Sequence, residues 1–151
     1  MKKIRINQIQ DYIDKEVKID GWVYNSRRSG KIGFLTLRDG FGLAQCIVVK
    51  NEIGDDLFED FKSLTQESSL SVIGNVVKNA RAIGGYEILV HNFEIHHLSQ
   101  DYPITPKEHG TEFLMSNRHL WLRSKRQHAI LKIRHQIIKS IRDFFDMNDF
   151  T

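Results

Sequence analysis

Three cations and an aromatic residue lie close together in one short segment, NSRRSGKIGF, which covers residues 25–34. The cations are Arg27, Arg28 and Lys31, and the aromatic residue is Phe34. Phosphate groups attract such cations and a base can stack on the ring, so the grouping indicates a site for single-stranded nucleic acid. Charged turns with hydrated side chains are also common, and the basic residues alone do not decide between the two interpretations.

The residues around this segment predict three consecutive strands, because apolar and polar residues alternate and turn residues interrupt the alternation. In chain order, we expect a strand at 17–24, a turn at 25–31, a strand at 32–38, a turn at 39–42 and a third strand ending at 49. In the second strand Leu35 and Leu37 would point into the core. Phe34 and Thr36 would then lie on the outer face, where they are free to bind a ligand.

The first hundred residues predict two more strands and two helices. In chain order, the further elements are a short helix at 8–13 with Asn7 and Gln10 as its capping pair, a helix at 55–64, a strand at 69–78, a turn at 79–85 and a strand at 86–97. Three strands, a helix and two strands follow the order of the OB-fold, a five-stranded Greek-key barrel that commonly binds oligonucleotides. The predicted fold class is therefore mainly β: an OB-fold barrel with a short N-terminal helix and a helix between strands 3 and 4.

A change of composition predicts a domain boundary after the barrel. Both prolines, Pro103 and Pro106, fall in a stretch without helical or strand periodicity. The predicted division is a barrel at 1–98, a linker at 99–115 and the start of a second domain at 116–151. In that second part, Ser124 opens a capping box for one long amphipathic helix, from Lys125 to about Met147.

The long helix carries a broad apolar stripe that must be buried against something. Its main members are Ile130, Ile133, Ile137, Ile141 and Phe144. Either the helix packs on its own barrel or on another copy of the chain, or the chain is the front of a longer protein. We expect a longer protein, because too few residues follow the predicted boundary to build a domain.

Composition excludes several classes of protein. The chain has no apolar run of transmembrane length and no signal peptide at its start, so we expect a soluble, cytoplasmic protein without a membrane partner. Cys46 is the single cysteine and cannot form an internal disulfide, which fits a reducing compartment. Neither a Cys-x-x-Cys spacing nor a Gly-x-x-x-x-Gly-Lys loop occurs, so we expect no catalytic, metal-binding or cofactor-binding residues in this chain.

The net charge of +3 arises in the C-terminal part of the chain. Residues 111–151 contain 8 Lys and Arg against 4 Asp and Glu, whereas residues 1–110 contain 14 against 15. A nucleic-acid site on the predicted barrel must therefore be a local patch and not a general basic surface.

Two long motifs carry a resemblance to a known family. The first, GWVYNSRRSGKIGFLTLRDGFGLAQCIV, resembles the N-terminal anticodon-binding domain of class II aminoacyl-tRNA synthetases of the aspartate, asparagine and lysine subgroup. It has a G-W-V strand, a basic turn, a strand ending in L-R-D and a strand with a central Gln. The second, YPITPKEHGTEFLMSNRHLWLRSKRQHAILKIR, is similar to the asparaginyl enzymes of this subgroup.

The resemblance implies a set of RNA-binding residues. Phe34 matches the aromatic residue that stacks on an anticodon base, and Gln45 matches the amide that hydrogen-bonds a base edge. Arg27 matches the basic residue of the turn, and Arg28 beside it joins the set. Glu87 matches an acidic residue that reads a base. A Gln amide can donate and accept, and a carboxylate accepts N–H bonds, so both report base identity.

The resemblance also implies a parent protein. The family's chain continues into a catalytic domain that uses ATP and magnesium to attach the amino acid to tRNA. This chain lacks those later motifs, so we expect a fragment that binds the anticodon loop of asparagine tRNA and has no catalytic activity itself. The helix at 125–147 would join two copies into a homodimer. The alternatives are a fragment of an aspartyl-type synthetase, a free-standing OB-fold module for single-stranded nucleic acid or tRNA, and a protein-binding OB-fold.

Overall fold

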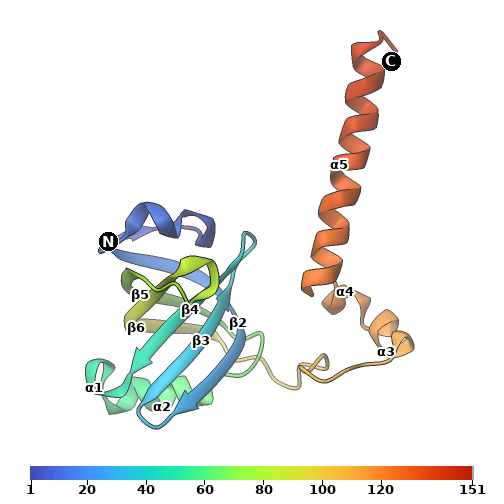
Figure 1. Ribbon diagram of the computed structural model, residues 1–151. Helices are drawn as coiled ribbons and strands as arrows, with labels where there is room; N and C mark the ends of the chain where they lie inside the picture. The colour runs from blue at the N-terminus through green and yellow to red at the C-terminus, as the bar shows by residue number, and fades with distance from the viewer. Residues whose placement is uncertain (151) are drawn as a thin grey trace. The chain divides into compact units, whose positions relative to one another are not determined.

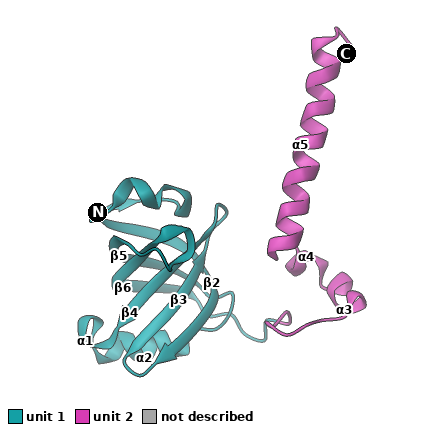
Figure 2. Ribbon diagram, viewed as in Figure 1, with its two compact units in different colours: residues 1–102 teal, residues 103–151 magenta. Residues whose placement is uncertain are grey.

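The chain folds as two compact units, Met1–Tyr102 and Pro103–Thr151 (Figure 2). The structure, a computed structural model, describes residues 1–150. The unit boundary falls inside the predicted linker at 99–115. The finer division into barrel, linker and second domain stays a prediction.

The first unit is a closed barrel. Its strands are β1 (Lys2–Lys3), β2 (Glu16–Ser29), β3 (Ile32–Arg38), β4 (Leu43–Val49), β5 (Ser69–Lys78) and β6 (Tyr86–His97) (Figure 1). They are hydrogen-bonded in the order β1-β2-β3-β4-β6-β5, and β2 also pairs with β5. The pairs β1–β2 and β4–β6 are parallel, and the other pairs are antiparallel. The predicted OB-fold is confirmed.

The predicted alternation of strand residues is also confirmed. Side chains that fill the barrel include Val17, Ile19, Val23, Leu35, Leu37, Cys46, Val48, Leu70, Val72, Ile88 and Val90, each at most 1% exposed. Phe34, Thr36 and Gln45 are half-buried, on the opposite face of their strands. One face of the sheet is therefore core, and the other face can bind a ligand.

Helices cover the two ends of the barrel (Figure 1). They are the 3₁₀ helix η1 (Ile6–Tyr12), α1 (Lys50–Ile53), α2 (Asp55–Ser63) and the 3₁₀ turn η2 (Ile83–Gly85). At one end, α2 buries Phe58 and Phe61. A Cβ atom on Gly33 would lie 2.4 Å from the Phe61 ring, so α2 packs directly on the backbone of β3. At the other end, the Ile6 amide donates to the Asp39 carboxylate, 2.8 Å away.

The turn predicted over residues 25–31 is wrong. Strand β2 continues to Ser29, which pairs with Ile32, so the turn contains only Gly30 and Lys31. Gly30 has a φ of 59°, a left-handed conformation that glycine adopts without a steric penalty.

A β-bulge explains how β2 extends past the predicted end of the strand. The register shifts between Val23 and Asn25, so Tyr24 is an extra residue on β2. Asn25 then lies opposite Thr36, and pairing resumes on the outer face. The prediction ended the strand at Tyr24 because residues 25–31 are polar, basic and glycine residues typical of a turn.

Two further details at the N-terminus differ from the prediction. The helix expected at 8–13 is the 3₁₀ helix η1, and its cap is formed by Arg5 and Gln8, with the Arg5 amide donating to the Gln8 side chain at 3.0 Å. Asn7 contributes only its backbone oxygen, which accepts from Gln10 at 2.9 Å. Strand β1 was not predicted, because two consecutive lysines show no alternation.

The second unit is helical. Its elements are α3 (Thr111–Ser116), α4 (Arg118–Trp121) and α5 (Lys125–Met147). The bounds predicted for α5 are confirmed, and the Ser124 side chain caps it by accepting from the Gln127 amide at 3.3 Å. The short helices α3 and α4 were not predicted. Within residues 1–150, no helix combines the length and the apolar character needed to cross a membrane.

A nearly buried ion pair connects β3 to the loop before β5. The guanidinium of Arg38 makes two parallel hydrogen bonds to the Glu67 carboxylate, at 2.8 and 2.7 Å. Their side chains are 16% and 4% exposed. Glu67 has a φ of 66°, and its backbone amide donates to Val23 at 2.7 Å. The pair therefore fixes this loop against the strands that it crosses.

Polar groups also connect the outer face of β2 to its neighbours. Ser71 donates to Asp20 at 2.7 Å and lies 2.8 Å from the His96 ring nitrogen, and Lys3 forms an ion pair with Asp20 at 2.5 Å. Burial raises the pKa of the Asp20 carboxyl, but the hydrogen bonds from Lys3 and Ser71 and the charges of Lys3 and Lys18 outweigh burial and lower it. Asp20 is thus held as the anion that joins β1 and β5 to β2.

Cys46 lies inside the barrel on the opposite face of β4 from Gln45. Burial raises the pKa of its thiol to about 12, so the neutral thiol persists at physiological pH. Cys46 therefore acts as a small apolar core residue.

We expect Glu67→Ala to lower the free energy of unfolding by about 3–5 kcal/mol, because it leaves the Arg38 charge without its carboxylate in a nearly buried position. The double variant Arg38→Met with Glu67→Leu removes both charges and should lose less free energy of unfolding than Glu67→Ala. Urea denaturation of the three chains measures this. A loss in the double variant as large as in Glu67→Ala would contradict it.

Candidate nucleic-acid interface

Polar side chains form a row across the outer face of three neighbouring strands. Thr36 of β3 lies opposite Gln45 of β4, and Gln45 lies beside Glu87 of β6. All three side chains are half-buried. Because paired residues on adjacent strands share a face, residues far apart in sequence are brought together here.

Glu87 accepts two hydrogen bonds on one carboxylate oxygen. Gln45 Nε2 donates to Glu87 Oε2 at 3.3 Å, and Asn79 Nδ2 donates to the same atom at 2.9 Å. Asn79 follows β5 directly, at the start of the turn that leads to β6. Gln45 and Glu87 were predicted as site residues, and the structure brings them into contact.

Phe34 and Arg27 form a second group beside this row. They lie opposite each other on β3 and β2, and the guanidinium carbon of Arg27 is 4.3 Å from the centre of the Phe34 ring. Phe34 pairs with Ile47, two residues along β4 from Gln45. Such diagonal neighbours lie about 7–8 Å apart, so a base stacked on the ring can present its edge to Gln45.

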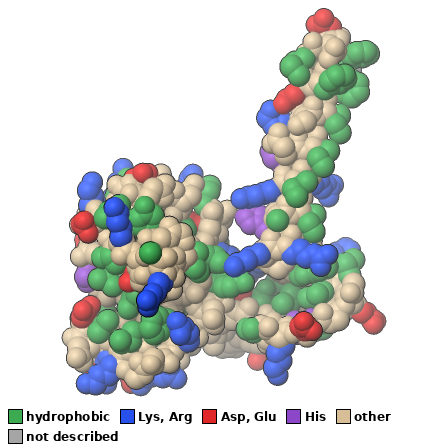
Figure 3. Space-filling model, viewed as in Figure 1, with side chains coloured by type: hydrophobic (Ala, Val, Ile, Leu, Met, Phe, Trp, Pro, Cys, Tyr) green, Lys and Arg blue, Asp and Glu red, His purple; other side chains and the backbone are tan. Residues whose placement is uncertain are grey.

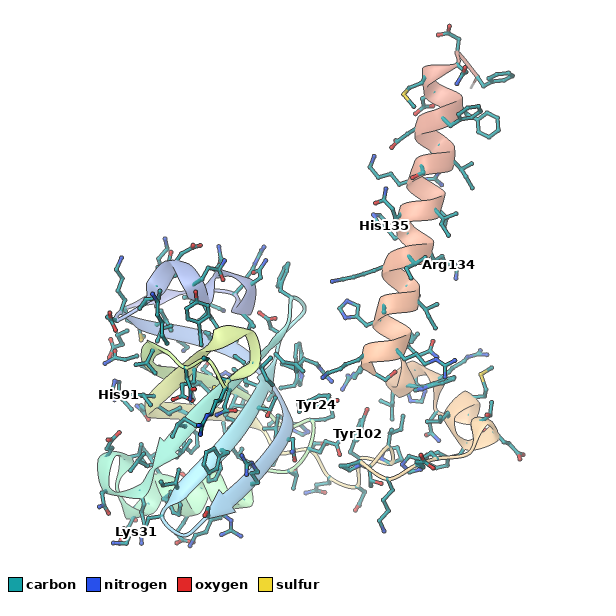
Figure 4. The ribbon with its side chains drawn as sticks, in the orientation of Figure 1. Tyr24, Lys31, His91, Tyr102, Arg134 and His135 are labelled. Atoms are coloured by element: carbon teal, nitrogen blue, oxygen red, sulfur yellow. The ribbon has the colours of Figure 1, made fainter. Side chains whose placement is uncertain are left out.

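Arg28 does not join this face. It lies opposite Gly33, and successive strand residues point to opposite sides of the sheet, so Arg28 is on the side covered by α2. Lys31 lies at the tip of the β2–β3 hairpin (Figure 4). Of the three cations in the segment, only Arg27 contacts the predicted stacking residue.

Positive charge is dispersed over the rest of the barrel. In the view of Figure 3, Lys and Arg side chains of the first unit alternate with hydrophobic and acidic ones instead of forming one continuous patch. This agrees with the balanced charge of residues 1–110. The face is therefore suited to a few bases and phosphates, and less to a long backbone.

Comparison with known families identifies the barrel. Residues 17–96 match the family described as OB-fold nucleic acid binding domain. The chain belongs to this OB-fold family. The match covers nearly all of β2 and β6 and the whole of β3, β4 and β5, and so includes every residue of the rows described above. Residues 110–151 of the same chain match a second family, tRNA synthetases class II (D, K and N).

Individual relatives extend the similarity over nearly the whole chain. It is 50% identical to the asparagine–tRNA ligase of Sorangium cellulosum (strain So ce56) over 149 residues, which are 98% of this chain and 33% of the relative. The asparaginyl-tRNA synthetase of Pyrococcus horikoshii, in complex with asparaginyl-adenylate, matches with a TM-score of 0.90 and 34% identity, over 97% of this chain and 34% of that one.

A third relative agrees. The asparaginyl-tRNA synthetase of Entamoeba histolytica, also in complex with asparaginyl-adenylate, has a TM-score of 0.81 and 29% identity, over 99% of this chain and 36% of that one. The resemblance to asparaginyl-tRNA synthetases inferred from the motifs is confirmed. The chain spans about a third of the length of these relatives.

Asn79 and the ion pair of Arg38 with Glu67 were missed in the sequence. Asn79 begins a turn, and an Asn there is explained by turn formation alone. Its position could have identified it. Asn79 directly follows β5, and Glu87 comes nine residues after the end of β5, on the neighbouring strand β6. Arg38 and Glu67 are 29 residues apart, and no periodicity links them.

We expect Arg27→Ala to reduce the slope of log binding constant against log salt for single-stranded RNA by about 0.7, the value for one phosphate contact. Arg28→Ala removes the same charge from the other side of the sheet and should change the slope less. Titration of a fluorescent RNA loop at several salt concentrations measures both slopes. Equal changes in the two variants would argue against an interface on the Phe34 face.

Proposed function

We propose that this chain is the anticodon-binding part of an asparagine–tRNA ligase. The observation that carries the proposal is the contiguous outer face that holds Phe34, Arg27, Gln45 and Glu87 on a barrel of the OB-fold nucleic-acid-binding family. The similarity to asparagine–tRNA ligases over nearly the whole chain supports the choice of amino acid.

Each side chain of the face has a distinct part in binding. A base of the anticodon loop stacks on the Phe34 ring, and its edge faces the Gln45 amide across the diagonal of the sheet. Arg27 already lies over the ring, so an arriving base takes the place of its guanidinium. The displaced guanidinium can then bind a phosphate of the same loop.

The proposal includes the sequence of the RNA. An asparagine tRNA carries the anticodon G-U-U, so the preferred loop should contain G-U-U, and a change of its middle uridine should weaken binding most. Gln45 carries this selectivity, because an amide can pair with a base edge through one donor and one acceptor. Gln45→Ala should therefore lose selectivity more than affinity.

The catalytic activity is proposed for the parent protein alone. Ligases of this class use ATP and magnesium to activate the amino acid. Within residues 1–150, no group of three or more His, Cys, Asp or Glu side chains is placed to hold a metal ion. We assign no residue of this chain to ATP or magnesium, and we propose a cytoplasmic location for the parent.

A further part of the proposal is a homodimer formed through α5. Its apolar stripe is exposed in this structure, with Ile133 at 61%, Ile137 at 54% and Ile141 at 51%. Burying a large aliphatic side chain contributes roughly 1.5–3 kcal/mol, so a second copy that covers the stripe would be stabilised.

Phe34→Ala tests anticodon binding. It removes the stacking surface and should cost about 1–3 kcal/mol of binding free energy for a G-U-U loop, with little change in salt dependence. Phe41→Ala is the matched control, because Phe41 is an exposed ring in the turn after β3 that is likewise covered by an arginine, Arg5, at 4.6 Å. Equal binding of G-U-U and scrambled loops, with no loss in Phe34→Ala, would leave a generic or protein-binding barrel.

Ile137→Glu tests the dimer. It places a charge in the apolar stripe and should shift sedimentation towards the monomer at concentrations where the wild type associates. His135→Glu is the control: residue 135 lies two positions before Ile137 on α5, about 200° around the helix, and its side chain is labelled in Figure 4. A wild type that stays monomeric at high concentration would rule out the dimer for this chain.

A further inference from the structure

We propose that Asn79 and Glu87 are positioning residues that fix the orientation of the Gln45 amide, and that this orientation makes the site select uridine over cytidine. The inference rests on the proposed function, because it concerns the same face and the same RNA. It gives Glu87 a role that differs from direct reading of a base.

The first step is the contact between Gln45 and Glu87. Gln45 Nε2 lies 3.3 Å from Glu87 Oε2. An ionised carboxylate only accepts hydrogen bonds, so the amide must turn its NH₂ group towards Glu87 and its oxygen away. The half-turn that would exchange the two groups places an oxygen against a carboxylate oxygen, and this repulsion disfavours the second orientation.

The second step is that Glu87 is itself held. Asn79 Nδ2 donates to Glu87 Oε2 at 2.9 Å. The other side-chain atom of Asn79, Oδ1, accepts from the Arg81 backbone amide at 3.0 Å, which fixes the orientation of this amide as well. Asn79 also donates its backbone N–H to Gly85 and accepts from Ala82. The backbone turn that begins at Asn79 therefore determines, through the side chains of Asn79 and Glu87, which way the Gln45 amide points.

The third step concerns the bases. Uridine presents an N3–H donor next to the O4 acceptor, whereas cytidine presents an N3 acceptor next to the N4 donor. An amide that is free to turn over can match either order, but a fixed amide matches one order and opposes the other. With its NH₂ group held at Glu87, Gln45 keeps one N–H and its oxygen for the base in a set order. The G-U-U anticodon of the proposed function selects uridine as the match.

Two variants test this without removing Gln45. Asn79→Asp keeps an oxygen for the Arg81 amide and so keeps the turn, but it loses the donor to Glu87. Glu87→Gln keeps the shape of the side chain, but its own amide can offer Gln45 either a donor or an acceptor. Glu87→Gln frees the Gln45 amide to turn over directly, whereas Asn79→Asp does so indirectly, because the Glu87 carboxylate loses its donor, is repelled by the new charge and no longer stays against Gln45. Asn75→Asp is the control, because it adds the same charge to β5 opposite Leu89.

The measurement is the dissociation constant of each chain for anticodon loops with G-U-U, G-C-U and G-U-C. We expect the wild type to prefer uridine over cytidine at one position by roughly 5- to 150-fold, the range of one good amide–base pair. In Asn79→Asp and Glu87→Gln this ratio should fall towards one, with a smaller change in affinity for the G-U-U loop. Asn75→Asp should weaken all three loops alike and keep the ratio.

The outcomes separate the inference from the proposed function. A wild-type ratio that persists in both Asn79→Asp and Glu87→Gln would overturn the positioning role and leave anticodon binding intact. A uniform loss of affinity with the ratio preserved would do the same, because it indicates a merely structural role. A wild type that binds all loops and scrambled RNA equally would overturn the proposed function and this inference with it.

Discussion

The architecture depends on one strand that is paired along both of its edges. The first half of β2, from Glu16 to Trp22, pairs with β5, and the second half, from Trp22 to Ser29, pairs with β3. This double pairing closes the sheet into a barrel, and closure leaves a single interior for apolar side chains. Each strand must then alternate between core and outer face, and the outer residues are carried on a rigid scaffold.

The position of the candidate binding face follows from that closure. Phe34, Gln45 and Glu87 come from three strands, and only the register of β3, β4 and β6 brings them together. The bulge at Tyr24 sets the phase of the second half of β2, and Arg27 therefore shares the face of Phe34 while Arg28 does not. One extra residue in a strand thus decides which of two consecutive arginines shares the face of Phe34.

Alternation was enough to predict the core strands, because a half-buried strand must place every second side chain inside. It gave β5 and β6 with their full bounds, and helical spacing together with Ser124 gave α5. It did not give the end of β2, because the residues after the bulge, 25–29, have no apolar side chains and were interpreted as a turn.

The parts of the site that depend on long-range geometry could not be predicted in the same way. The contact of Asn79 with Glu87 crosses from one strand end to the next strand, and its existence depends on the length of the turn between them. Gln45 and Glu87 were predicted from the resemblance to a family, residue by residue, and their contact with each other was not foreseen. Motifs identify residue types, whereas the network that orients them belongs to the folded state.

The guanidinium that covers Phe34 has a consequence for the thermodynamics of recognition. Because Arg27 already shields the ring, a base that binds as in the proposed function would displace a charged group and not only water. The apolar surface removed from water on binding is then smaller than for a bare ring, and so is the negative heat-capacity change that accompanies it. The same cover also shields an aromatic surface that could otherwise bind unrelated proteins.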